Sequence, residues 1–205
     1  MKAKLLGAVV VLIMVGLASF GWVGYRLFTT GFSAKTEPHA LEVLMARQIR
    51  HLAIPIENRN AENPVPSSPE VLKEARAHFA DHCAVCHAND GSGQTPIGKN
   101  VYPKAPDLRL NDTQSLSDGE LFWVIHNGIR FTAMPAWGSG EPEKDLDSWK
   151  LVHFIRHLPQ VTQEELDEMK ALNPKTRQER LEEEAFDQFL QGDDTAAGKA
   201  DGHRH

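Results

Sequence analysis

Cysteine is scarce in this sequence: only two of its 205 residues are cysteines, and both lie within the five-residue segment 83–87. A structural zinc site built on these two thiols would need a second pair of Cys or His ligands at compatible spacing. No second cysteine pair exists. The two thiols must therefore be interpreted together, as parts of one short motif.

Basic residues are also too few to form a positively charged stripe. The net charge is −6, divided as +3 over residues 1–69, −3 over 70–158 and −6 over 159–205. Nucleic acid is therefore an unsuitable partner, because binding it requires clustered Lys and Arg side chains that release counterions. The sequence also shows little sign of β-strands, and its apolar residues recur mainly at helical spacing.

The two cysteines belong to the run Cys83-Ala84-Val85-Cys86-His87, a C-x-x-C-H pattern. This spacing is typical of the covalent attachment of a c-type haem. Two thiols separated by two residues can reach the two vinyl groups of one porphyrin and become thioethers. A histidine directly after the second cysteine is then held under the iron as its proximal ligand. The pattern indicates Cys83, Cys86 and His87 as haem-binding residues.

Three other interpretations of the cysteine pair compete with haem. A zinc half-site lacks its second cysteine pair. A thioredoxin-like redox pair belongs beside a βαβ pattern, for which this chain gives little strand signal. A disulfide is the third, although so short a loop would remove little entropy from the unfolded chain. We favour haem, and the rest of the sequence must support or weaken that choice.

The amino terminus contains a long apolar segment. Residues 5–25 carry no charge, and as a helix they would span about 31 Å, the thickness of a hydrocarbon core. Lys2 and Lys4 precede the segment and favour a cytoplasmic amino terminus. A cleaved signal peptide is the alternative, but its apolar region is usually shorter. We predict an uncleaved single-pass anchor over residues 1–28 in a bacterial cytoplasmic membrane, with the remainder on the periplasmic side.

Residues 29–67 are predicted to form a juxtamembrane helix and a linker. Apolar side chains recur near helical spacing over residues 39–54, and Pro55 would stop a helix there. Residues 55–69 hold four prolines with several Asn and Ser, which predicts a semi-extended linker.

The predicted haem domain covers residues 68–159. It opens at residues 67–70, where either Ser67 pairs with Glu70 in a capping box or Ser68 caps a helix with Pro69 at its first position. That helix continues into the cysteine motif and places Phe79 on its inner face. The following loop, residues 94–111, has three prolines and no periodicity, as expected if it wraps a large prosthetic group and turns Leu108 inward. A last core helix, residues 145–158, should cross the first near Phe79.

Met134 is the predicted distal ligand of the iron. A capping box at Ser117 and Glu120 opens a helix that ends at Gly128, and Met134-Pro135 follows in a loop. A thioether is a soft, neutral ligand that favours ferrous iron, and Pro135 fixes the backbone beside it. The other candidate ligands are interpreted as packing or surface residues: Met45, Met169, His78, His82, His126, His153 and His157.

Taken together, residues 68–158 resemble the class I c-type cytochromes. The resemblance rests on the C-x-x-C-H motif at the end of the first helix and on Met134-Pro135-Ala136-Trp137 after the second capped helix. It implies an all-α haem fold, one covalent haem c and one-electron transfer through an exposed haem edge. By residue, it implies thioethers at Cys83 and Cys86, with His87 and Met134 as the axial ligands.

The carboxyl-terminal part lies outside that resemblance. Residues 160–191 are predicted to form an acidic helical extension, which Thr162 and Glu165 open with a capping box. In its second helix, Leu181 and Phe186 belong to a narrow apolar stripe that we expect to pack on the haem domain. Residues 192–205 are expected to be a disordered tail. The histidines in that tail are read as solvated rather than metal-binding.

These expectations describe an electron carrier rather than an enzyme, with redox proteins at the membrane as donors and acceptors. Two alternatives remain. The chain could be the haem subunit of a larger membrane dehydrogenase or terminal oxidase complex. It could instead bind gas or catalyse a reaction at iron, if Met134 is not a ligand, because an iron held by two protein ligands has no open position.

Overall fold

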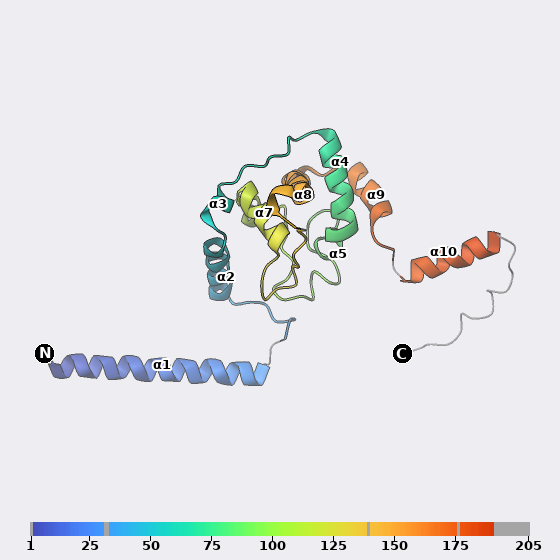
Figure 1. Ribbon diagram of the computed structural model, residues 1–205. Coiled ribbons are helices and arrows are strands. Elements are labelled where there is room, and N and C mark those ends of the chain that lie inside the picture. The colour runs from blue at the N-terminus through green and yellow to red at the C-terminus, as the bar shows by residue number, and fades with distance from the viewer. Residues whose placement is uncertain (1, 31–32, 139, 176, 191–205) are drawn as a thin grey trace.

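A computed structural model describes residues 2–30, 33–138, 140–175 and 177–190. The described residues contain helices but no strand, so the all-α prediction is confirmed (Figure 1). The longer helices are α1 (Lys2–Thr30), α2 (Ala40–Ala53), α4 (Pro69–His78), α7 (Asp118–Asn127), α8 (Leu146–His157), α9 (Gln163–Leu172) and α10 (Arg177–Leu190). The short ones are α3 (Ile56–Arg59), α5 (Ala84–His87), α6 (Asn111–Gln114), the π-helical turn η1 (Phe79–Cys83) and the 3₁₀ turns η2 (Pro142–Lys144) and η3 (Leu158–Gln160).

Helix α4 leads directly into the cysteine motif. Of the two starts that the sequence allows, the structure has the second: Ser68 Oγ accepts a hydrogen bond from the Val71 amide, and Pro69 is the first helical residue. The helix widens into the π-helical turn η1 and then narrows again into α5, which ends at His87. π-Helical turns inside α-helices are frequent at functional sites.

The core lies between α4, α7 and α8, which pack together in Figure 1. Phe79 of η1 meets Phe154 of α8 with ring centroids 5.1 Å apart, so the predicted crossing of the first and last core helices is confirmed. On the other side of α8, Trp149 stacks on Phe122 of α7 at 4.1 Å. Aromatic pairs at these distances add to the stabilisation from apolar burial. Met169 of α9 completes the core and is fully buried.

The proline-containing segment after α2 packs against the haem domain. Ile54, at its start, is 1% exposed, and the short helix α3 follows it against α7. Ser117 Oγ donates to the Arg59 carbonyl at 2.6 Å, and Asn63 Nδ2 donates to the Trp149 carbonyl at 3.0 Å. Residues 60–68 contain no helix, so the segment is extended for part of its length but is held against the domain.

The acidic extension divides into a packed part and an exposed part. Helix α9 lies against α4 and η1, and Arg76 joins it to α4 through an ion pair with Glu165 at 2.8 Å. In α10 the apolar stripe is exposed instead, with Leu181 at 53% and Phe186 at 60%. The expectation that this stripe packs on the haem domain is therefore wrong. The predicted disordered tail, with His203 and His205, lies outside the described residues.

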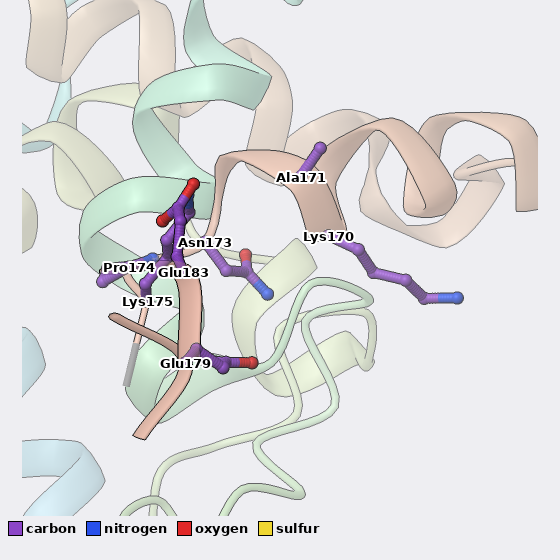
Figure 2. Close-up of a pocket in the computed structure, with 7 residues that line it drawn as sticks. All are labelled: Lys170, Ala171, Asn173, Pro174, Lys175, Glu179 and Glu183. Carbon is purple, nitrogen blue, oxygen red and sulfur yellow. The ribbon is translucent and has the colours of Figure 1, made fainter. Parts of the chain in front are cut away.

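An open pocket separates α9 from α10 (Figure 2). Its lining is mostly charged or polar and consists of Lys170, Ala171, Asn173, Pro174, Lys175, Glu179 and Glu183. Lys175 pairs with Glu183 at 2.6 Å on this surface. None of these residues belongs to the cysteine motif or to the Met134 loop, so the pocket is separate from the predicted haem site.

Glu165 holds α9 in place, and its replacement should loosen that helix. Burial disfavours the charged form, but hydrogen bonds from the Thr162 amide and His157 outweigh it and lower the pKa of Glu165 to about 2. Because the pKa is lowered by folding, the stabilisation is present above the ordinary value of 4.5 and is lost as the pH falls towards 2. We expect Glu165→Gln to cost about 1–2 kcal/mol at neutral pH in urea unfolding, and progressively less as the pH falls towards 2. Glu164→Gln is the exposed control; an equal loss there would contradict the assignment.

Candidate functional site

The two cysteines lie at the junction of η1 and α5, one helical turn apart. Three-residue spacing on a helix puts both side chains on the same side. Both thiols are free and partly buried. Burial, with a smaller effect of Cys86, raises the pKa of Cys83 to about 12, and burial also raises the pKa of Cys86. These thiols therefore remain protonated at neutral pH.

Protonated thiols are difficult to reconcile with a redox-active C-x-x-C pair, which requires a thiolate with a lowered pKa. Among the described residues, moreover, no group of three or more His, Cys, Asp and Glu side chains is arranged to hold a metal ion. Neither a thioredoxin-like pair nor a zinc half-site fits this geometry.

His87 presents a buried imidazole with an unused nitrogen. Its Nδ1 is buried and lacks a hydrogen-bond partner. Burial lowers the pKa of His87, while the Pro106 carbonyl acts in the opposite direction. The ring is thus neutral, the form in which histidine binds metals. A neutral imidazole directly after two thiols on one helical turn fits the requirements of a covalently attached haem.

The loop after His87 folds back over the motif. Thr95 Oγ1 donates to the Cys86 carbonyl at 3.2 Å and accepts from the Gly98 amide at 2.8 Å. The amide of Leu108 then donates to the Gly91 carbonyl at 2.8 Å, and the Leu108 side chain is buried, as the sequence predicted. Arg109 fixes the end of the loop by pairing with Asp90. The loop is therefore ordered by contacts with the attachment segment.

Gly98 is required by this close approach. A Cβ atom at this position would lie 2.2 Å from the Cys86 carbonyl oxygen, a backbone atom that cannot rotate away. We expect Gly98→Ala to destabilise the fold by about 2 kcal/mol or more and to reduce the yield of haem-loaded protein. The measurements are urea unfolding and the haem-to-protein ratio. The exposed neighbour gives the control: Lys99→Ala should change neither, and unchanged haem loading in Gly98→Ala would refute the argument.

The loop that carries Met134 folds back along α7. Helix α7 ends at Gly128, whose φ of +67° is in the left-handed region that favours glycine. Beyond it, the Ile129 amide donates to the Met134 carbonyl at 3.1 Å, and the Trp137 amide donates to the Ile125 carbonyl at 3.0 Å. Met134 itself is partly buried. These hydrogen bonds fix the backbone from which the Met134 side chain extends.

One aromatic contact joins this loop to the cysteine helix. The Trp137 ring lies edge-on to the His82 ring of η1, with centroids 5.5 Å apart. His82 is therefore a packing partner of this loop. The contact places the segment that carries Met134 beside the segment that carries Cys83.

A buried His–Asp pair supports the far end of the Met134 loop, and sequence reasoning missed it. His126 Nδ1 lies 2.6 Å from Asp145 Oδ2, and both side chains are less than 10% exposed. The Gly138 amide donates to the His126 carbonyl at 3.0 Å, and a Cβ on Gly138 would come within 2.0 Å of the His126 ring. Asp145 also caps α8 by accepting from the Ser148 amide at 3.1 Å. The Asp-x-x-Ser spacing in the sequence indicates the helix cap, but it gives no indication of the contact between His126 and Asp145.

Three of the remaining candidate ligands have structural partners. His153 contacts the Val65 carbonyl at 2.7 Å, and His157 contacts Glu165 at 3.0 Å. Met169 is buried in the core. Met45 is 54% exposed on α2.

A family model described as cytochrome c oxidase, cbb3-type, subunit III, matches residues 70–155. This part of the chain is a c-type cytochrome domain. A comparison with curated proteins found no match. The matched residues run from the first turn of α4 almost to the end of α8, so they include the cysteine motif and the Met134 loop. The cytochrome domain carries covalently bound haem c, which agrees with the protonated thiols and the unused nitrogen of His87.

Proposed function

We propose that the protein is a membrane-tethered, one-electron carrier whose haem iron has His87 and Met134 as its axial ligands. The single observation that supports this most is the attachment helix itself, with two protonated thiols and a neutral, buried imidazole on one turn. Bound haem c supplies a one-electron couple at a potential set by its axial ligands and surroundings.

Several residues of the protein would hold the haem, each in a different role. Cys83 and Cys86 would form the thioethers, and His87 would donate its ring nitrogen from the same turn. Met134 would approach from the α7 loop, whose hydrogen bonds along α7 fix its position. Leu108 and Phe79 exclude water from the interior, which favours the less charged, reduced state. With both axial positions taken by the protein, substrates and gases have no place at iron, so the proposed role is transfer and not catalysis.

Helix α1 would provide the tether. Its segment Lys4–Arg26 is long and apolar enough to cross a membrane, and no part of it is buried by the rest of the protein. Lys2 and Lys4 favour a cytoplasmic amino terminus, which would place the haem domain on the periplasmic side. We accordingly divide the chain into an anchor (1–28), a helix with its packed connection (29–67), the haem domain (68–159) and the acidic extension (160–191).

A second candidate is a haem subunit of a larger membrane oxidase. It is favoured by the matching family model, whose description names an oxidase subunit. The exposed apolar stripe of α10, which includes Leu181 and Phe186, would give such a complex a surface to bind.

Both candidates can be tested on the full-length protein purified in detergent. A carrier should be monomeric, contain one haem per chain and give a reversible one-electron titration. The absorption spectrum of the reduced protein should also stay unchanged when carbon monoxide is added. Carbon monoxide binding would refute the proposed axial pair. Stoichiometric co-purifying subunits would favour the oxidase-subunit alternative.

A further inference from the structure

Helix α2 exposes a continuous apolar stripe. Five large side chains recur at spacings of three or four residues along it, and each is between 54% and 71% exposed. They are Leu41, Leu44, Met45, Ile49 and Leu52. This spacing places all five on one side of the helix. A stripe of this kind is costly to leave in water, because each side chain would gain free energy from burial.

Polar side chains of α2 contact the haem domain. Arg47 pairs with Asp112, and His51 Nδ1 lies 2.8 Å from Glu120 Oε1. Glu42 accepts a hydrogen bond from the Tyr102 hydroxyl. At 100° per residue, Arg47 lies well away from the stripe, whereas Glu42 and His51 lie at its two edges. These contacts are polar, and they leave the stripe exposed.

The stripe is also continuous with the apolar surface of α1. Helix α1 ends at Thr30 and α2 begins at Ala40, so the two are separated by nine residues. Such a segment spans at most about 30 Å when extended, which keeps α2 close to the end of α1. One open groove between the helices is lined by Trp22 of α1 together with Leu41, Met45 and Ile49 of the stripe. In Figure 1, α2 lies above α1 and at one flank of the haem domain.

We propose that α2 is an interfacial helix whose stripe lies in the headgroup and acyl-chain boundary of the bilayer that α1 crosses. This inference rests on the membrane tether proposed above. Lipid fits the stripe better than a protein does, because its side chains are aliphatic or thioether and lack the Trp, Tyr and Arg anchors that dominate protein interfaces.

A consequence is that the haem domain would be held in one orientation above the membrane. The ion pairs of Arg47 and His51 join α2 to the residues that open α6 and α7. A helix fixed in the bilayer surface would then limit rotation of the domain about its tether. Restricting both position and orientation raises the effective concentration of the haem edge for a membrane-bound partner.

Contact with lipid can be measured on the full-length, haem-loaded protein in phosphatidylcholine–phosphatidylglycerol vesicles. Single cysteines are introduced by Ile49→Cys in the stripe, Ile13→Cys in α1 and Lys99→Cys on an exposed loop, and each is labelled with the fluorophore NBD. Labelling is selective because Cys83 and Cys86 are occupied by haem. Each emission is compared between vesicles with brominated and unbrominated acyl chains, so that quenching by haem cancels in the ratio.

The label at Ile49→Cys should lose about half of its emission in brominated vesicles, as should the label at Ile13→Cys, while Lys99→Cys stays unchanged. If only Ile13→Cys is quenched, α2 does not lie in lipid and the inference is wrong, although the tether stands. If neither is quenched, the tether itself fails and the inference fails with it. The variants are expected to fold, because Ile49 is 62% exposed and outside the core.

Discussion

Replacing Met134 with alanine should abolish the long-wavelength ferric absorption band that marks sulfur ligation of haem iron. It should also lower the reduction potential by an amount on the order of 100 mV or more, because loss of the neutral thioether removes the ligand that favours ferrous iron. Haem attachment should persist, since Cys83, Cys86 and His87 belong to another element. The measurements are the ferric spectrum and a potentiometric titration of the full-length protein.

A second methionine of the same domain provides a matched control. Met169→Leu removes a sulfur from the buried core and nearly conserves its volume, so the spectrum and the potential should stay as they are. Met134→His would restore two ligands but give a lower potential than the native pair. If Met134→Ala retained the sulfur band, or if Met169→Leu lost it, the proposed distal ligand would be wrong.

The local parts of this molecule could be predicted from the sequence, because each depends on residues a few positions apart. The capping box at Ser117 and Glu120 is present, with both of its hydrogen bonds. The same holds for Thr162 and Glu165. The C-x-x-C-H motif is likewise local, and the family match extends over the segment that contains it. Such signals need no knowledge of tertiary structure.

Contacts between distant segments could not be predicted in this way. Ile54 ends a predicted helix whose other large apolar residues are exposed, yet it is only 1% exposed, and the segment after it contacts α7, which follows much later in the chain. The stripe of α2 predicts a helix correctly but not that polar groups, rather than apolar ones, face the domain. For α10 the error is the opposite one. Its apolar stripe, which includes Phe186, was expected to pack on the haem domain but is exposed among the described residues. In each case periodicity identifies an amphipathic helix but not what covers it.

The π-helical turn at Phe79–Cys83 is another feature that the sequence did not reveal. It widens the helix just before the motif. There it brings the His82 ring against Trp137 of the Met134 loop. Propensity does not distinguish a π-turn from an ordinary helical turn, because the same residues favour both. Long-range packing decides the geometry here, and the sequence motif only marks its position.

Asp145→Ala should be strongly destabilising, because it removes two interactions at once. The α8 amide of Ser148 would lose its cap, which costs about 1 kcal/mol. The His126 ring is 8% exposed and stacked on Phe122, and it would lose its hydrogen-bond partner. This loss adds about 1–3 kcal/mol. We expect a total of about 2–4 kcal/mol in urea unfolding at neutral pH.

The pH dependence of this loss gives a second check. Burial opposes ionisation of Asp145, but hydrogen bonds from Ser148 and His126 outweigh it and lower the pKa of that carboxyl. Since folding lowers the pKa, the stabilisation is present above the ordinary range of an Asp side chain and is lost as the pH falls through the folded-state value. The difference in unfolding free energy between the native protein and Asp145→Ala should therefore shrink in acid.

Asp147→Ala is the matched control for this prediction. Asp147 lies two residues further along in the first turn of α8, is exposed and pairs with Lys150. Its removal should cost less than about 0.5 kcal/mol. Asp145→Ala should also weaken the sulfur band, because the His126 carbonyl accepts from Gly138 at the end of the Met134 loop. Equal losses in the two variants would show that the buried pair does not support the fold. A sulfur band unchanged in Asp145→Ala would show that the pair does not position the Met134 loop.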